Sequence, residues 1–94
     1  MSNEMKWTPG PWHTGKGSFP FQININTDSG TIATVYGETG ENEANAHLIA
    51  AAPELYAALA DMISSYEALG APLPMAKEVE VALCALAKAR GEQP

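Results

Sequence analysis

The chain has 94 residues, 46% of them hydrophobic, and a formal net charge of −6 from eleven acidic and five basic side chains. No Lys or Arg occurs from Gly17 to Ala76, which excludes the broad basic surface that duplex DNA requires. No run of about 18 apolar residues is present, so we expect no membrane-spanning helix. The length predicts a single domain, 1–94, made of a loose N-terminus (1–6), a β part (7–37) and a helical part (42–90).

Two features of the sequence bear on the cellular compartment. The single cysteine, Cys84, has no second cysteine with which to form an internal disulfide, which agrees with a reducing environment. The first ten residues lack the charged and then apolar pattern of a secretory signal. We therefore expect the protein to act in the cytoplasm.

The first ordered segment is predicted to be Trp7–Trp12, in which two prolines surround a glycine and exclude a helix. We expect its two tryptophans to pack against the open end of a small sheet; the alternative is that one of them stacks on a ligand. The following Gly15-Lys16-Gly17-Ser18 lacks the spacing of a phosphate-binding loop, so we predict a flexible turn there.

Two strands are predicted next. Residues 21–26 alternate between apolar and polar side chains, and residues 31–36 are mostly β-branched. A three-residue loop, Asp28-Ser29-Gly30, would join them as a hairpin. Because a lone hairpin is barely stable, a third strand is required, and residues 12–14 are the candidate.

This loop length predicts the register of the hairpin. One face would carry Phe21 with the pairs Ile23–Val35 and Ile25–Ala33, and we expect that face to meet a helix. The opposite face would carry the pairs Gln22–Tyr36, Asn24–Thr34 and Asn26–Ile32.

A long helix is predicted over residues 44–69, preceded by Asn42 as N-cap and by Glu41 and Glu43, which favour the positive end of the helix dipole. Pro53 removes one backbone hydrogen bond inside it. We favour a kinked but continuous helix over a break with a restart at Pro53, because the apolar stripe keeps its phase. The stripe consists of Leu48, Ala52, Leu55, Leu59, Met62, Tyr66 and Leu69.

A second helix follows the stop and restart signals of Gly70 and Pro74 and extends to about Arg90, before Gly91. Its predicted apolar side is Met75, Val79, Ala82, Leu83 and Leu86. The fold class is therefore α+β: a small antiparallel sheet followed by a long kinked helix and a second helix that form an αα-hairpin.

The long helix offers more apolar stripe than one small sheet can cover. The small side chains of Ala50–Ala52 also permit close approach of another helix. We therefore predict a homo-oligomer, either a dimer or a ring of dimers. The predicted interface consists of Leu48, Ala52, Leu55, Leu59, Met62 and Tyr66.

Catalysis finds little support in the sequence. The two histidines, His13 and His47, lie in separate segments without the ligand spacing of a zinc site, so we expect no metal and no cofactor. No serine lies in a nucleophile elbow, and Cys84 is interpreted as an inert thiol. We therefore expect a protein that is not an enzyme.

Three stretches carry a resemblance: Lys6–Trp12 (KWTPGPW), Ile32–Gly37 (IATVYG) and above all Glu43–Leu55 (EANAHLIAAAPEL). Over roughly residues 6–60 the chain resembles a widespread set of small phage and prophage proteins. The resemblance implies a phage-encoded accessory protein that acts in the host cytoplasm.

The order of strands and two helices is also similar to that of the Thoeris anti-defence proteins, which bind cyclic nucleotide signals without cleaving them. This similarity implies a counter-defence protein that sequesters a small cyclic nucleotide. Such a site needs cations or a helix N-terminus for the phosphates and an aromatic ring for the base. The candidate ligand-binding residues are Trp12, Tyr36, Asn42, Asn45, His47, Lys88 and Arg90.

The acidic composition favours an alternative function. An acidic inhibitor would dock on a basic surface of a host protein, as several anti-CRISPR proteins do. The acidic loop with Glu38, Glu41 and Glu43 would make that contact. A regulatory phage adaptor without a ligand is a third interpretation.

Overall fold

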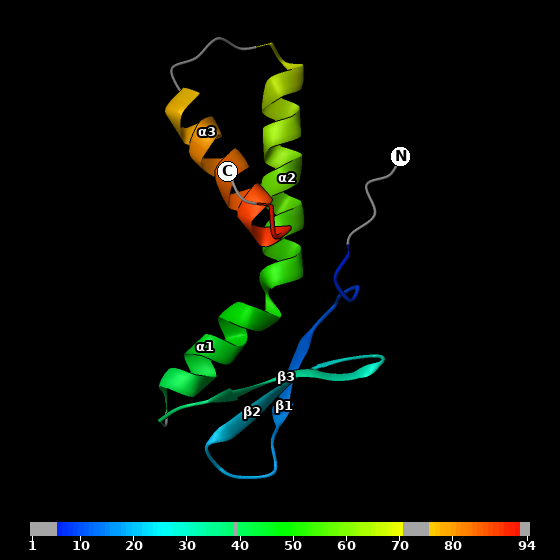
Figure 1. Cartoon of the computed structure of the whole chain (residues 1–94), viewed down its shortest axis with the longest axis vertical. Coiled ribbons are helices and arrows are strands. Elements are labelled where there is room, and N and C mark those ends of the chain that lie inside the picture. The colour runs from blue at the N-terminus through cyan, green and yellow to red at the C-terminus, as the bar shows by residue number, and fades with distance from the viewer. Residues whose placement is uncertain (1–5, 39, 71–75, 93–94) are drawn as a thin grey trace. The chain divides into compact units, whose positions relative to one another are not determined.

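The computed structural model describes residues 6–38, 40–70 and 76–92. It confirms the α+β class: three strands precede the helices (Figure 1). The elements in chain order are β1 (His13–Lys16), β2 (Gln22–Thr27), β3 (Gly30–Tyr36), α1 (Glu41–Ala50), α2 (Ala52–Ala68) and α3 (Ala76–Ala89).

The chain divides into two compact units. The first unit, Trp7–Glu54, contains the sheet and α1. The second unit contains the segment Leu55–Pro94, with nearly all of α2 and with α3. The expected β part thus lies in the first unit, and the expected helical part is shared between the two. That the whole chain acts as one domain stays a prediction.

The sheet of the first unit is antiparallel with the order β1-β2-β3. Ile23 lies opposite Val35 and Ile25 opposite Ala33, as predicted. The predicted third strand is present beside β2, but it extends through Lys16, which pairs with Ile23. The prediction of a flexible turn over Gly15 and Lys16 was therefore wrong.

Contacts across the sheet explain why β1 can continue through Gly15. A Cβ atom at this position would lie 2.6 Å from the Asn26 amide nitrogen, so glycine lets the Asn26 side chain lie over β1. Asn24 also contacts this strand, donating through Nδ2 to the Lys16 carbonyl at 3.4 Å. The composition of this segment is typical of a turn, but its pairing with β2 stabilises it as a strand.

The β2–β3 connection differs from the prediction by one residue. Thr27 pairs with Gly30, so the turn contains only Asp28 and Ser29. Thr27 Oγ1 stabilises it by accepting from the Ser29 amide at 3.0 Å and donating to the Gly30 carbonyl at 3.2 Å.

The additional residue appears as an irregularity between Ile25 and Asn26, where the register shifts. Asn26 therefore pairs with Thr31 and not with Ile32 as predicted, and Thr31 Oγ1 donates to Asn26 Oδ1 at 2.6 Å. On the same face Thr34 Oγ1 donates to Asn24 Oδ1 at 2.9 Å. Beyond the irregularity the predicted register is intact.

The core of the first unit lies between the sheet and α1. Ile25, Val35 and Ala46 are buried, and three partly buried side chains pack against them: Trp12, Ile23 and Ala50. The indole of Trp12 also donates to the Thr8 carbonyl at 3.0 Å. The packing role expected for Trp12 is therefore confirmed. Phe21, predicted to belong to this face, is instead 52% exposed.

Helix α1 begins at Glu41 with Gly40 as N-cap, so the prediction of Asn42 as N-cap was wrong. Asn42 lies inside the first turn and is only 3% exposed. A glycine suits the cap because its φ of 96° lies in the left-handed region. The helix start is therefore set by the backbone at Gly40, while the Asn42 side chain is used elsewhere.

The helix predicted to continue through Pro53 is interrupted. Helix α1 ends at Ala50 and α2 begins at Ala52. The prediction of a continuous helix was therefore wrong, and the alternative of a break is confirmed. Pro53 cannot donate to the carbonyl of Ile49, which removes the bond that would join the turns. Its ring lies against Gly10, where an added Cβ would be 3.2 Å from Pro53 Cβ. The break therefore lies where the Trp7–Trp12 segment packs.

The second unit contains α3 and nearly all of α2, and Arg90 Nη1, just beyond α3, donates to Tyr56 Oη of α2 at 2.8 Å. The half-buried face of α2 consists of Tyr56, Leu59, Ala60, Ile63 and Tyr66. On α3, Leu86 is buried and Val79, Ala82 and Ala87 are half-buried. The predicted apolar side of α3 is thus largely confirmed; Leu83 is 43% exposed, and Met75 lies outside the described residues.

The helix ends agree with the sequence signals. Gly70 and Gly91 both have positive φ, 64° and 80°, and lie two residues beyond the last residues of α2 and α3. No single helix in the described ranges is both long and apolar enough to cross a membrane; α1 and α2 meet that test only when counted together across their break.

Candidate functional site

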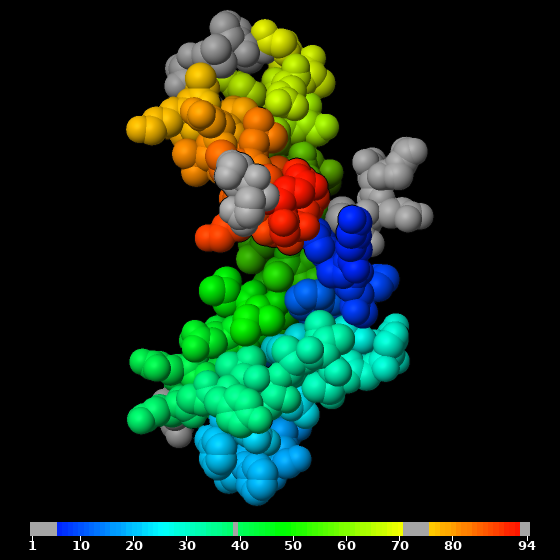
Figure 2. Space-filling model, in the orientation of Figure 1, coloured from blue at the N-terminus to red at the C-terminus, as the bar shows by residue number. Residues whose placement is uncertain are grey.

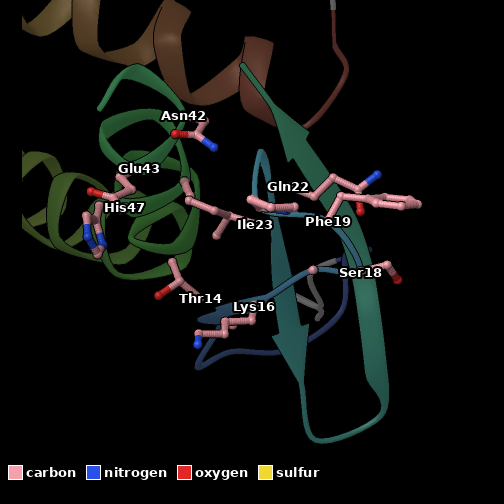
Figure 3. Close-up of a pocket in the computed structure, with 13 residues that line it drawn as sticks. Thr14, Lys16, Ser18, Phe19, Gln22, Ile23, Asn42, Glu43 and His47 are labelled. Carbon is pink, nitrogen blue, oxygen red and sulfur yellow. The ribbon is translucent and has the colours of Figure 1, made fainter. Parts of the chain in front are cut away.

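The first unit contains a concave pocket of about 870 Å³ between the β1–β2 hairpin and α1 (Figure 3). The hairpin lines it with residues 14–20, 22 and 23, and α1 lines it with Asn42, Glu43, Ala46 and His47. In Figure 3, Thr14 and Lys16 lie on the hairpin side of the pocket, while Glu43 and His47 project from α1.

Two backbone hydrogen bonds shape the hairpin loop beside this pocket. The Gly17 amide donates to the Gln22 carbonyl at 3.1 Å, and the Gln22 amide donates to the Phe19 carbonyl at 3.0 Å. A Cβ atom at Gly17 would lie 2.6 Å from Gln22 Cβ, so the close approach of the chain to Gln22 at this position requires glycine. The loop therefore has a defined conformation in which Phe19 and Phe21 occupy fixed positions.

Asn42 connects α1 to that loop. Its Nδ2 donates to the Phe21 carbonyl at 3.2 Å, across 21 residues of sequence. Its Oδ1 is buried and has no hydrogen-bond partner. Gly37 allows this arrangement, because a Cβ atom there would approach Asn42 Cβ to 3.3 Å. Asn42 thus acts as a buried link between the start of α1 and the β1–β2 loop.

The charges around the pocket are mixed. Lys16 is the only Lys or Arg among its lining residues, and Glu43 adds a carboxylate on α1 beside His47. The first turn of α1 carries a second carboxylate, Glu41. Acidic side chains at this helix end oppose the attraction that the helix dipole has for an anion.

An exposed cluster of aromatic side chains lies next to the pocket, and we name it the aromatic patch: Phe19, Phe21 and Tyr36. The Phe19 and Phe21 rings stack with centroids 5.7 Å apart and an interplanar angle of 10°, and the Tyr36 ring lies 6.5 Å from that of Phe21. The three side chains are 55%, 52% and 61% exposed. In Figure 3 the Phe19 ring points away from α1, and the loop that carries it forms part of the surface in Figure 2 (light blue).

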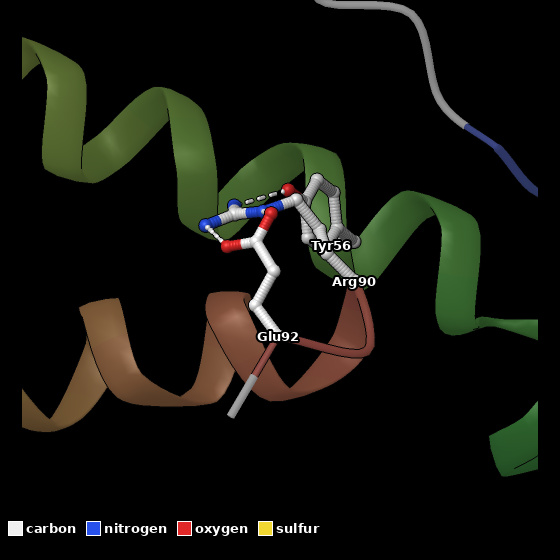
Figure 4. Close-up of polar contacts among 3 residues, drawn as sticks. All are labelled: Tyr56, Arg90 and Glu92. Atoms are coloured by element: carbon white, nitrogen blue, oxygen red, sulfur yellow. Dashed lines mark hydrogen bonds and ion pairs between the residues drawn. The ribbon is translucent and has the colours of Figure 1, made fainter. Parts of the chain in front are cut away.

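The second unit contains the remaining predicted cations. Arg90 Nε and Nη2 donate to the two carboxylate oxygens of Glu92 at 3.1 and 3.0 Å, and its Nη1 donates to Tyr56 Oη at 2.8 Å (Figure 4). The hydrogen bonds with Arg90 hold the pKa of Glu92 below its usual value. Arg90 is therefore engaged at the end of α3 with groups of its own unit.

The seven predicted ligand residues do not form one site. Asn42 and His47 line the pocket, whereas Asn45 is exposed on α1 and is not among the lining residues. Trp12 packs against the core and Tyr36 belongs to the aromatic patch. Lys88 and Arg90 lie in the second unit.

Sequence reasoning missed Phe19 and Phe21 as surface residues of this region. The spacing of two aromatic residues around Pro20, directly after a glycine-rich segment, is a usable signal for an exposed loop. It was outweighed by the alternation that assigned Phe21 to the buried face. The described residues contain no group of three or more His, Cys, Asp or Glu side chains arranged to hold a metal ion.

The fold and this surface define a small two-unit α+β protein whose first unit presents a pocket and an aromatic patch. The chain belongs to the family of the Salmonella phage P22 protein Y8K6, whose family model it matches over residues 1–93. The predicted phage origin is thereby confirmed. No curated protein and no solved structure matches the chain.

Proposed function

We propose that this phage protein acts by non-catalytic binding to a basic surface of a host protein, through the aromatic patch and the acidic residues beside it. The observation that carries the proposal is the stacked and exposed arrangement of Phe19, Phe21 and Tyr36. Aromatic side chains, phenylalanine included, are enriched in protein interfaces relative to the rest of the surface. In a phage-encoded protein, a component of host defence is a suitable target.

The size of the patch agrees with the centre of an interface. With 150–250 Å² per aromatic side chain, three half-exposed rings present roughly 300 Å² of surface. A stable interface buries about 800 Å² on each partner, so surrounding residues must also take part. The nearest along the chain are Glu38, Glu41 and Glu43, all of which are exposed.

Asn42 joins these acidic residues to the patch. Its backbone N–H donates to the Glu38 carbonyl at 3.1 Å, and its side-chain Nδ2 donates to the Phe21 carbonyl at 3.2 Å. Asn42 therefore links the chain segment that carries the acidic residues to the loop that carries Phe21. An apolar centre with an acidic rim is complementary to a partner with a basic rim.

Site-specific photocrosslinking tests this proposal. We expect a photoreactive phenylalanine analogue at position 21 to capture a defined host protein, while the same analogue at the exposed Ala57 in the second unit does not. With the purified partner, Phe21→Ala should weaken binding at least tenfold, and Glu41→Lys should slow association most at low salt. Capture that is equal at both positions, or an affinity unaffected by Phe21→Ala, would contradict the proposal.

The pocket supports a second candidate function, the sequestration of a small cyclic nucleotide. Lys16 and His47 could contact a phosphate, and the volume of about 870 Å³ suits a ligand of that size. The proposal ranks second because Glu43 lies among the lining residues and the Phe19 ring points away from α1.

Thermal denaturation with a panel of cyclic dinucleotides and cyclic ADP-ribose isomers tests this function. Sequestration predicts that one compound raises the melting temperature and is recovered intact after denaturation, and that Lys16→Ala abolishes the shift. Lys77→Ala, in the second unit, is the matched control. Chemical change of the compound, or no shift with any of the panel, would reject this candidate.

A further inference from the structure

The pocket of the first unit carries two opposite charges that do not pair with each other. Lys16, on β1, is the one Lys or Arg among its lining residues, and Glu43, on α1, is the one carboxylate. Within the described part of the chain, neither side chain has a hydrogen bond or an ion pair. Lys16 lies on the hairpin side of the pocket and Glu43 projects from α1 (Figure 3). The two sides of the pocket therefore present unpaired charges of opposite sign.

The α1 side of the pocket offers hydrogen-bond acceptors. Asn42 precedes Glu43, is 3% exposed and lines the pocket. Its Nδ2 donates to the Phe21 carbonyl, whereas its Oδ1 is buried and has no partner. Because an unpaired buried acceptor is costly, a donor that enters here gains a hydrogen bond as well as the attraction of the Glu43 carboxylate. A donor of this kind with a positive charge is an ammonium or guanidinium group.

The hairpin side of the pocket suits an anion. The Lys16 ammonium offers three donors, and Thr14, two residues earlier on β1, lies on the same face of the strand and adds a hydroxyl. Between the two sides the lining includes the apolar side chains of Ile23 and Ala46, which belong to the core contact between the sheet and α1. The pocket thus combines an anion site, an apolar centre and a cation site.

A ligand with a single charge is attracted by one side of this pocket and repelled by the other. A lone carboxylate or phosphate meets Glu43, and a lone amine meets Lys16. The net charge of −6 on the whole chain adds a further repulsion for an anion. A ligand that carries both charges and is neutral overall avoids all three terms. The charges of the pocket therefore select against the simpler ligands.

We infer that this pocket binds a small aliphatic zwitterion, with an ammonium group at Glu43 and Asn42 Oδ1 and a carboxylate at Lys16 and Thr14. The aliphatic chain between the two groups covers Ile23. The pocket volume of about 870 Å³ lies in the range of small-molecule sites. Binding of such a ligand requires no host protein at the aromatic patch.

NMR titration of the ¹⁵N-labelled full chain tests the inference, with 6-aminohexanoate as the probe. We expect saturable shifts at the amides of Gly15 and Ala46, and none in α3. Hexanoate and hexylamine share the aliphatic chain but carry one charge each, and each should bind roughly three- to tenfold more weakly. No saturation below about 50 mM 6-aminohexanoate, or equal binding of a single-charge probe, would overturn the inference.

Charge variants assign the two ends of the ligand. Glu43→Gln should weaken the binding of 6-aminohexanoate roughly three- to tenfold, and it should strengthen that of hexanoate because a repulsion is removed. Lys16→Gln should likewise weaken 6-aminohexanoate and strengthen hexylamine. Glu54→Gln is the matched control, since Glu54 is an exposed carboxylate of the first unit that does not line the pocket. Parallel losses for all three probes would indicate a merely structural effect and would overturn the inference.

Discussion

Replacing Ile25 with alanine is expected to destabilise the first unit by about 2–4 kcal/mol, a large part of the stability of so small a unit. Ile25 is the only large side chain among the described residues that is fully buried. It lies in one cluster with Val35 and Ala46, at the contact between the sheet and α1. Its removal leaves a cavity that the surrounding sheet and helix cannot easily close.

Urea denaturation followed by tryptophan fluorescence measures this effect, because both tryptophans of the chain, Trp7 and Trp12, lie in the first unit. Ile32→Ala is the matched control: Ile32 lies at the register irregularity of the sheet and is 40% exposed, so we expect a change below about 1 kcal/mol. Equal losses for the two substitutions would show that the core is not centred on Ile25.

Replacing Asn42 with aspartate is expected to cost about 2–4 kcal/mol at pH 7, although the two side chains have nearly the same shape. The Asn42 side chain is 97% removed from solvent, corresponding to its 3% exposure, and donates to the Phe21 carbonyl. An aspartate would bury a carboxylate facing that carbonyl and would remove the donor. The link between α1 and the loop of the aromatic patch would be lost with it.

The loss in Asn42→Asp should depend on pH in a definite direction. Burial raises the pKa of the new carboxyl group in the folded state above its unfolded value of about 3.9. The unfolded state then binds fewer protons than the folded state in the interval between the two pKa values, so stability falls as the pH rises through it. As the pH falls from 7 to about 4, we therefore expect most of the difference in stability between Asn42→Asp and the unchanged protein to disappear.

Asn45→Asp provides the matched control for this measurement. Asn45 lies on the same helix, three residues further on, and is exposed. We expect a change within about 0.5 kcal/mol and little dependence on pH. If Asn42→Asp behaved in the same way, the buried link between α1 and Phe21 would not exist in solution.

The amino-acid sequence by itself determined those features that depend on neighbouring residues. The alternation over residues 21–26 located β2 and its partners in β3, because side-chain direction in a strand repeats every second residue. Gly70 and Gly91 marked the ends of α2 and α3, since glycine adopts the left-handed conformation without strain. The α+β class followed from the order of these local patterns.

Only the tertiary structure decided how the site is built. Asn42 is a residue type that often caps helices, but its side chain is buried and donates to the Phe21 carbonyl, a partner 21 residues away. Phe21 had the phase of a core residue, yet it stacks with Phe19 on the surface. Pro53 was compatible with either a kinked or an interrupted helix; in the structure the helix is interrupted, and Gly10 packs against the Pro53 ring. Local periodicity predicts which helices and strands form. Whether a given side chain is buried or exposed, and what it contacts, depends on groups distant in the sequence that only folding brings close to it.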